Sequence, residues 1–263
     1  MTTNVPVEKK PQHSWHDYLG ALGRAHRKAS VELGPSLPLL QHLNELRQRL
    51  FKALAAVAVT TVISFIFAKQ LINYLASPVG GSQALVSIEV TENIAVYMRV
   101  SLLSGLVLGM PFVLYQLMRF ILPGLKGNER LWLLVGVPLA SALFVMGVAF
   151  TWFVMIPNAV PFLTNFIGIT THVRPANYFD FITTLMFWIG LSFEMPIVMM
   201  MLAKLKFITA GQLARGWRYA VVIIAVIAAA ITPTVDPINM SLVMAPLMGL
   251  YLVSVLLTAI AGR

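Results

Sequence analysis

Long apolar runs alternate along this chain with shorter polar segments. Six runs stand out, at roughly 53–76, 100–122, 131–156, 179–203, 219–232 and 238–260. Most are close to the about 20 residues that a helix needs to cross a hydrocarbon core of about 30 Å. A backbone in lipid has no hydrogen-bond partner outside itself, so each spanning run must be a helix. The pattern predicts an all-α polytopic membrane protein with six transmembrane helices.

The fifth predicted helix is short. Residues 219–232 would form about 21 Å of helix, well below the hydrocarbon thickness, and Pro233 ends the run. Such a helix must thin the bilayer or draw in its flanking residues. In the second run, Ser101, Gly105 and Gly109 recur every four residues, a spacing that favours close helix packing.

Basic residues gather on one side of this predicted membrane domain. Sixteen of the nineteen Lys and Arg residues lie in or beside the segments on the side of the two termini, and three lie on the other side. The positive-inside rule therefore places both termini in the cytoplasm, as expected for a multi-pass protein of the cytoplasmic membrane. The formal net charge of +9 then reflects topology and attraction to anionic lipid. We expect no nucleic-acid partner.

Residues 1–36 form a separate polar and basic segment before the domain of residues 37–263. It has no apolar core of the kind that a cleavable signal peptide requires. Aromatic and leucine residues between positions 15 and 22 have the spacing of a short interfacial helix. A mobile cytoplasmic tail is the interpretation that we adopt. His13 and His16 lack further ligands nearby, so we expect no metal site.

The composition excludes several kinds of chemistry. Charged residues make up 11% of the chain, against about a quarter in soluble domains. There is no cysteine, which excludes disulfides and thiolate metal sites. The sequence shows no Gly-rich phosphate loop, no metal-ligand spacing and no nucleophile–base pair. We therefore expect neither an enzyme nor a cofactor.

Glu194 breaks the apolar pattern near the middle of the fourth predicted helix. A charged side chain at this depth costs about 2.5–3.5 kcal/mol on insertion scales. Pro196, just beyond it, leaves the Ser192 carbonyl without its helical donor. Two interpretations stay open: a buried glutamate satisfied by a neighbouring helix, and a residue that engages a partner or takes part in transport.

The other notable acidic residues lie near the predicted membrane surfaces. Asp236 lies at the outer mouth between the fifth and sixth helices, where it either caps the sixth helix or has a functional role. Glu89 and Glu92 lie in the outer loop after the first helix, where we expect them to be solvated. Glu45 and Glu129 share the cytoplasmic face with several cations. The residues alone favour intramolecular ion pairs for these two, with recognition of a cationic ligand as the alternative.

Taken in order, the motifs from Leu37 to Pro246 resemble the TatC family. The matching elements are HLNELRQRL ending at Leu50, Pro78 in the outer loop, PFVLYQLMRFILPGL ending at Leu125, Glu129–Arg130, SFEMP around Glu194, and ITPTVD ending at Asp236. Six motifs in order on a six-helix frame are highly specific. The resemblance implies a receptor and core subunit of the twin-arginine translocase, driven by the proton-motive force. Its ligands would be twin-arginine signal peptides of folded precursor proteins.

The resemblance also implies roles for single residues. Glu45, Glu129 and Arg47 would form the site that reads the arginine pair. Glu194 would engage a transmembrane helix of a partner, and the short fifth helix would dock single-span TatA- and TatB-type subunits. Pro78 and Asp236 would belong to the outer, periplasmic caps. We further expect contacts with membrane lipid and a homo-oligomeric assembly.

Three positions depart from the family pattern. Arg99 stands where a lysine is usual, Met240 where a glutamine is usual, and Leu252 where a glutamate is common. The last two make the sixth helix more apolar, so we expect no polar partner contact of the usual kind there. The competing hypothesis is a proton- or ion-coupled secondary transporter with Glu194 as the coupling carboxylate. Against this hypothesis, the sequence lacks the internal repeat and the paired broken helices of such transporters.

Overall fold

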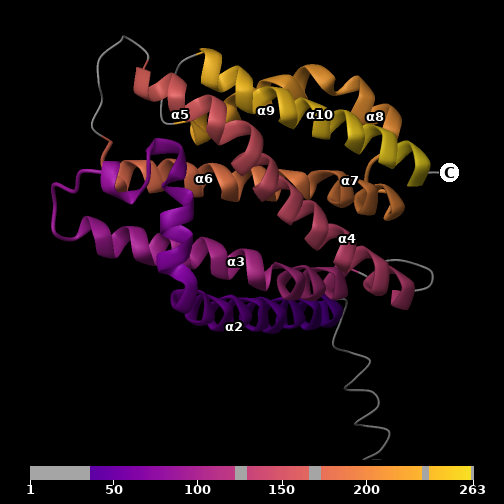
Figure 1. The fold of residues 1–263 in the computed structure, drawn as a ribbon. Helices are drawn as coiled ribbons and strands as arrows, with labels where there is room; N and C mark the ends of the chain where they lie inside the picture. The colour runs from indigo at the N-terminus through magenta and orange to yellow at the C-terminus, as the bar shows by residue number, and fades with distance from the viewer. Residues whose placement is uncertain (1–35, 122–128, 166–172, 233–236, 262–263) are drawn as a thin grey trace, which may run out of the picture. The chain divides into compact units, whose positions relative to one another are not determined.

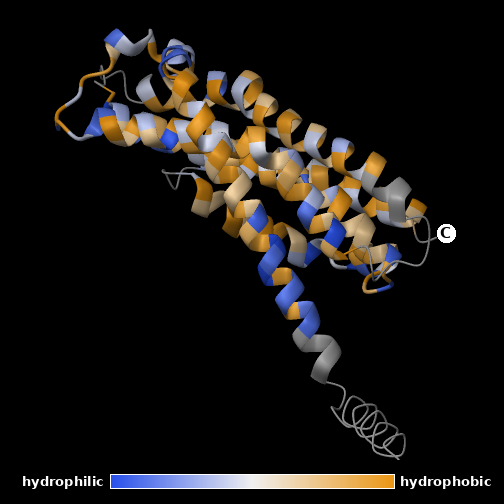
Figure 2. Cartoon of the chain, turned by 90° about the horizontal axis from the view of Figure 1, so that it is seen from below, coloured by the Kyte–Doolittle hydropathy of each residue, from blue (hydrophilic) through white to orange (hydrophobic). Residues whose placement is uncertain are grey.

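The computed structural model describes residues 36–121, 129–165, 173–232 and 237–261. Every regular element in these residues is helical (Figure 1). The chain divides into two compact units, Met1–Gln48 and Arg49–Arg263, and each is described by itself. Hydrophobic residues dominate the helices of the second unit, and hydrophilic ones gather at helix ends and in loops (Figure 2).

The helices follow one another with short connections. Their bounds are α2 Ser36–Leu75, α3 Glu92–Ile121, α4 Glu129–Phe150, α5 Ile156–Asn165, α6 Pro175–Phe193, α7 Met195–Lys204, α8 Ala210–Arg215, α9 Trp217–Ile231 and α10 Pro237–Ala261. Two 3₁₀ turns, η1 Ser77–Val79 and η2 Ser82–Ala84, follow α2, and a π-helical turn, η4 Thr151–Met155, joins α4 to α5.

Five stretches of described helix are long and apolar enough to cross a membrane. They are Gln41–Val79, Glu92–Ile121, Leu134–Thr164, Pro175–Lys204 and Asn239–Ala261, and Trp217–Ile231 is a shorter apolar helix. The helical segments at all six predicted positions are confirmed, and so is the shortness of the fifth, which has 15 residues. Helix α10 continues through Pro246 without interruption.

Small residues let α3 approach α2 closely. A Cβ atom added to Gly105 would lie 2.5 Å from the Cα atom of Thr61, so only glycine fits there. Thr60 Oγ1 donates a hydrogen bond of 2.7 Å to the Gly105 carbonyl, and Tyr97 donates one of 2.6 Å to the Phe65 carbonyl. The packing face that the four-residue spacing predicted is therefore confirmed for Gly105.

Further along the chain, α6 packs against both α3 and α4. Gly147 and Gly190 bring α4 and α6 together, since a Cβ atom on Gly147 would lie 2.9 Å from the Cα atom of Gly190. Helix α7 packs on α10, and α10 packs on α9 (Figure 1). The short helix α9 also contacts α6, so it lies beside the broken α6–α7 segment.

Candidate functional site

The fourth apolar segment is broken at Glu194. Helix α6 ends at Phe193 and α7 begins at Met195, with Glu194 between them. The break follows from Pro196, which lacks an N–H and cannot continue the hydrogen-bond ladder of α6. The local defect that Pro196 predicted is therefore confirmed as an interruption of one residue, Glu194.

Glu194 is buried, with 5% of its surface exposed. Its Oε1 atom has no hydrogen-bond partner within the described residues. A buried polar atom without a partner costs about 1–3 kcal/mol, so an ordinary structural glutamate would be expected to find a donor. The described neighbours do not supply one for this oxygen. Both interpretations drawn from the sequence therefore stay predictions: the oxygen has no donor within the described residues, yet the side chain is buried.

An apolar cleft of about 350 Å³ opens next to this break. Ser192 and Met195, which flank Glu194 in sequence, line it together with Tyr219, Ile223 and Ile227 of α9. Helix α9 has an exposed apolar stripe at helical spacing, formed by Tyr219, Val222, Ile223, Val226 and Ile227. Of the residues at the break, Ser192 and Met195 line the cleft and Glu194 does not.

The predicted signal-peptide residues fall in different units. Glu45 and Arg47 lie on α2 within residues 1–48, where Arg47 is exposed and Glu45 is partly exposed. Nδ1 of His42 lies 3.8 Å from Oε2 of Glu45. Glu129 is the first residue of α4, and its side chain lies outside the described part. Proximity of Glu45 to Glu129 therefore stays a prediction.

The predicted cap residues have different outcomes. Pro78 lies in the turn η1 and lines a cleft with Trp152, Phe153 and Pro161 at the end of the third segment. This places Pro78 at a junction between the first and third apolar segments. Asp236 lies outside the described residues.

An ion cluster at this end of the helices corrects one expectation. Glu92, predicted to be solvated, is 3% exposed. Arg174 donates to the Glu92 carboxylate through Nε, at 2.8 Å, and through Nη2, and Nη2 also reaches Glu89 Oε1 at 3.0 Å. The hydrogen bonds to Glu92 and Glu89 raise the pKa of the Arg174 guanidinium. Glu92 is buried because the fold brings it against a cation 82 residues away.

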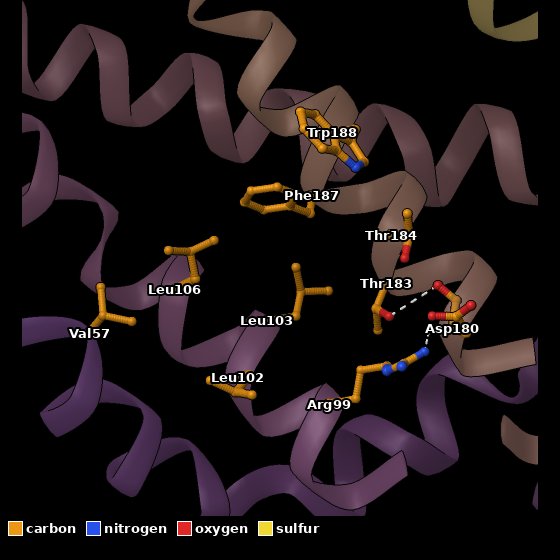
Figure 3. Close-up of a pocket in the computed structure, with 10 residues that line it drawn as sticks. All are labelled: Val57, Arg99, Leu102, Leu103, Leu106, Asp180, Thr183, Thr184, Phe187 and Trp188. Carbon is orange, nitrogen blue, oxygen red and sulfur yellow. Dashed lines mark hydrogen bonds and ion pairs between the residues drawn. The ribbon is translucent and has the colours of Figure 1, made fainter. Parts of the chain in front are cut away.

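A second ion pair joins Arg99 of α3 to Asp180 of α6 (Figure 3). The sequence analysis did not single out Asp180 as a site. One sequence feature could have predicted this pair: opposite charges, Arg99 and Asp180, lie at the starts of the second and fourth apolar runs. No group of acidic and histidine residues suited to a metal ion occurs in the part of the chain that the structure describes.

Comparisons with known proteins agree with this architecture. The family model for the Sec-independent protein translocase protein (TatC) matches residues 41–246. The chain is 35% identical over 263 residues to the chloroplastic Sec-independent protein translocase protein TATC of Arabidopsis thaliana, covering 98% of this chain and 77% of the relative. It is 36% identical over 234 residues to TatC of Deinococcus radiodurans, covering 86% of this chain and 87% of the relative.

A solved structure also matches. It is a crystal structure of the twin-arginine translocase receptor TatC, with a TM-score of 0.76 and 34% identity, covering 84% of this chain and 100% of the solved chain. The family match, the full-length relatives and the shared fold extend over most of the helical domain. The chain therefore belongs to the TatC family of Sec-independent protein translocase proteins, which are multi-pass membrane proteins.

Proposed function

We propose that this chain is the receptor and core subunit of a twin-arginine translocase, which binds the signal peptides of folded precursors and recruits single-span partner subunits. The observation that carries the proposal is the uncovered apolar stripe of α9, which lines one cleft with Ser192 and Met195, the residues on either side of the buried Glu194. The solved relative that shares the fold is named as a twin-arginine translocase receptor.

In this proposal, Glu194 and α9 form one docking surface for a partner helix. The stripe of α9 supplies apolar contact area along a helix of only 15 residues. Because the Glu194 side chain is buried, a polar side chain on the partner's helix would reach its carboxyl group only after the helices that cover it move. In a membrane, such interhelical hydrogen bonds add to close packing as a source of helix association.

Signal-peptide recognition is assigned to Glu45 and Glu129, with Arg47 shaping the site. An arginine presents a planar fork of donors that a carboxylate accepts in a bidentate way, whereas a lysine offers a single point charge. Two carboxylates would therefore favour an arginine pair over a lysine pair. Hydrogen bonds to charged groups are worth about 1.5–3 kcal/mol, so two of them discriminate strongly and still allow release.

The test is a binding assay between the detergent-solubilised protein and a twin-arginine signal peptide. Glu129→Arg should abolish binding, because it places like charge against the ligand. Exchanging the peptide's arginines for lysines should weaken binding to the original protein. That penalty should shrink in the Glu45→Gln, Glu129→Gln double variant, run as a double-mutant cycle.

Glu89→Gln is the matched control, because it neutralises a carboxylate at the opposite end of the helical domain. It should keep the preference for arginine over lysine. An undiminished preference in the Glu45, Glu129 double variant would assign the reading of the arginines to other residues.

We further propose that α9 completes a six-helix arrangement with both termini in the cytoplasm. Cysteines placed at Ser82 and Asn177 should then react with a membrane-impermeant reagent added from outside. A cysteine at Gln212 should react only after the membrane is permeabilised, so that the reagent reaches the cytoplasmic face. Labelling of Gln212 from the same side as Ser82 would reject the six-span topology.

A further inference from the structure

The ion pair between Arg99 and Asp180 lies in an unusual place for two charges. Both belong to segments long and apolar enough to cross a membrane, α3 and the α6–α7 segment. Their side chains are nevertheless 46% and 59% exposed. Arg99 Nη1 donates to Asp180 Oδ1, and within the described residues neither side chain makes any other side-chain hydrogen bond. Several donor and acceptor positions therefore stay open to a ligand.

The depth of the pair is set by the helices that carry it. Arg99 lies seven residues after Glu92, the first residue of α3, which is about 10 Å along the axis. Asp180 lies five residues after Pro175, the first residue of α6, or about 8 Å. A 30-residue helix such as α3 is about 45 Å long, which matches a bilayer with its headgroup layers. An upright α3 would thus hold the pair near the level where headgroups meet acyl chains.

An apolar cleft of about 380 Å³ extends from the pair (Figure 3). Leu102, Leu106, Phe187 and Trp188 line it beyond the two charges. Its apolar side chains provide contacts for a flexible acyl chain.

From this geometry we infer a binding site for a zwitterionic phospholipid with a primary ammonium headgroup, of the phosphatidylethanolamine class. The lipid phosphate would accept from the guanidinium of Arg99, and its ammonium would donate to the carboxylate of Asp180. One acyl chain would fill the cleft past Leu102 and Trp188. The site lies in the leaflet that faces the α2–α3 connection.

The charge pattern selects among lipid classes. A purely anionic headgroup would meet Asp180 as well as Arg99, so attraction and repulsion would oppose each other. A quaternary ammonium has no N–H and cannot donate a hydrogen bond to Asp180. Only a headgroup with a phosphate and a primary ammonium satisfies both residues with charge-assisted hydrogen bonds. Exposing charged side chains to lipid at this depth costs free energy unless they have polar partners. A lipid headgroup that supplies such partners would therefore bind at this ion pair.

The site goes beyond the proposed receptor function and does not depend on it. It requires only that α3 and α6 lie in a bilayer. A failure of signal-peptide binding would not contradict the lipid site, and a failure of lipid binding would not contradict the receptor proposal.

The experiment is native mass spectrometry of the purified full chain after incubation with equimolar phosphatidylethanolamine, phosphatidylcholine and phosphatidylglycerol. We expect phosphatidylethanolamine to be retained over phosphatidylcholine by roughly two- to tenfold. The Arg99→Gln, Asp180→Asn double variant removes both charges and should lose this preference. Lys69→Gln, a matched control on an exposed cation of α2 outside the cleft, should keep it.

A second variant separates the cleft from the charges. Thr184→Phe would fill the cleft beside an intact ion pair and should lower total lipid retention. Equal retention of phosphatidylethanolamine and phosphatidylcholine by the original chain would overturn the inference, and so would an unchanged preference in the double variant. Binding of a single-span helical peptide that depends on Arg99 and Asp180, without any lipid preference, would identify the cleft as a helix site instead.

Discussion

Glu92 and Glu194 are both buried carboxyl groups, yet their surroundings differ. Glu92, 3% exposed, accepts hydrogen bonds from the guanidinium of Arg174 and from the backbone N–H of Ile88. Glu194, 5% exposed, keeps one oxygen without a partner within the described residues. Burial alone therefore does not distinguish a structural acid from a functional one. The hydrogen-bond partners of the two acids differ, and we expect an acid that is buried for stability to find its donors within the fold.

The difference is also one of helix geometry. Glu92 is the first residue of α3, where unpaired backbone N–H groups favour an acidic side chain. Glu194 is held between two helices at a proline-dependent break. At the first position the acid joins the ends of two apolar segments, and at the second it lies buried inside one segment.

Removing the cation from the Glu92 cluster should have the largest effect on stability. Arg174→Met leaves a buried carboxylate without its main donor, so the melting temperature of the purified protein should fall by several degrees. Its level in the membrane should fall as well. Arg174→Lys keeps the charge but loses the two-nitrogen contact, so its effect should be intermediate. A melting temperature unchanged by Arg174→Met would show that the cluster is not structural.

Changing Glu194 should have a large effect on partner contacts and a smaller one on stability. Glu194→Ala removes the polar group, so crosslinking between α9 and a single-span partner and export of precursors should both drop strongly while membrane levels hold. Glu194→Gln keeps size and hydrogen bonding, so it should be milder. Loss of the protein from the membrane with partner contacts intact among the remaining molecules would make Glu194 a structural residue like Glu92.

The smallest effect is expected from Glu89, at the exposed edge of the same cluster. Its side chain is 66% exposed, and surface ion pairs contribute little because water screens them. Glu89→Gln should shift the melting temperature by less than about 2 °C. A shift as large as that of Arg174→Met would mean that the three residues act as one unit, which a double variant with Arg174 would reveal.

Much of the fold could be predicted from the hydropathy pattern. A bilayer demands that every spanning segment satisfy its own backbone, so apolar length alone identifies the helices. The short fifth segment and the helix interruption next to Pro196 could also be predicted, because a proline disrupts the helix only within about one turn of its own position. The site residues were predicted by motif, and their roles stay predictions; the family model matches residues 41–246.

The pairing of charges was decided only by tertiary structure. Glu92 and Arg174 are 82 residues apart, and Arg99 and Asp180 are 81 residues apart. In the sequence each of these residues belongs to a different loop or helix end, where solvation is the simplest expectation. The close packing of α6 against α3 brings them together. Local sequence determines which segments enter the membrane, because entry depends on the transfer free energy of each segment by itself. The partner of a polar side chain depends instead on which helices the fold places side by side.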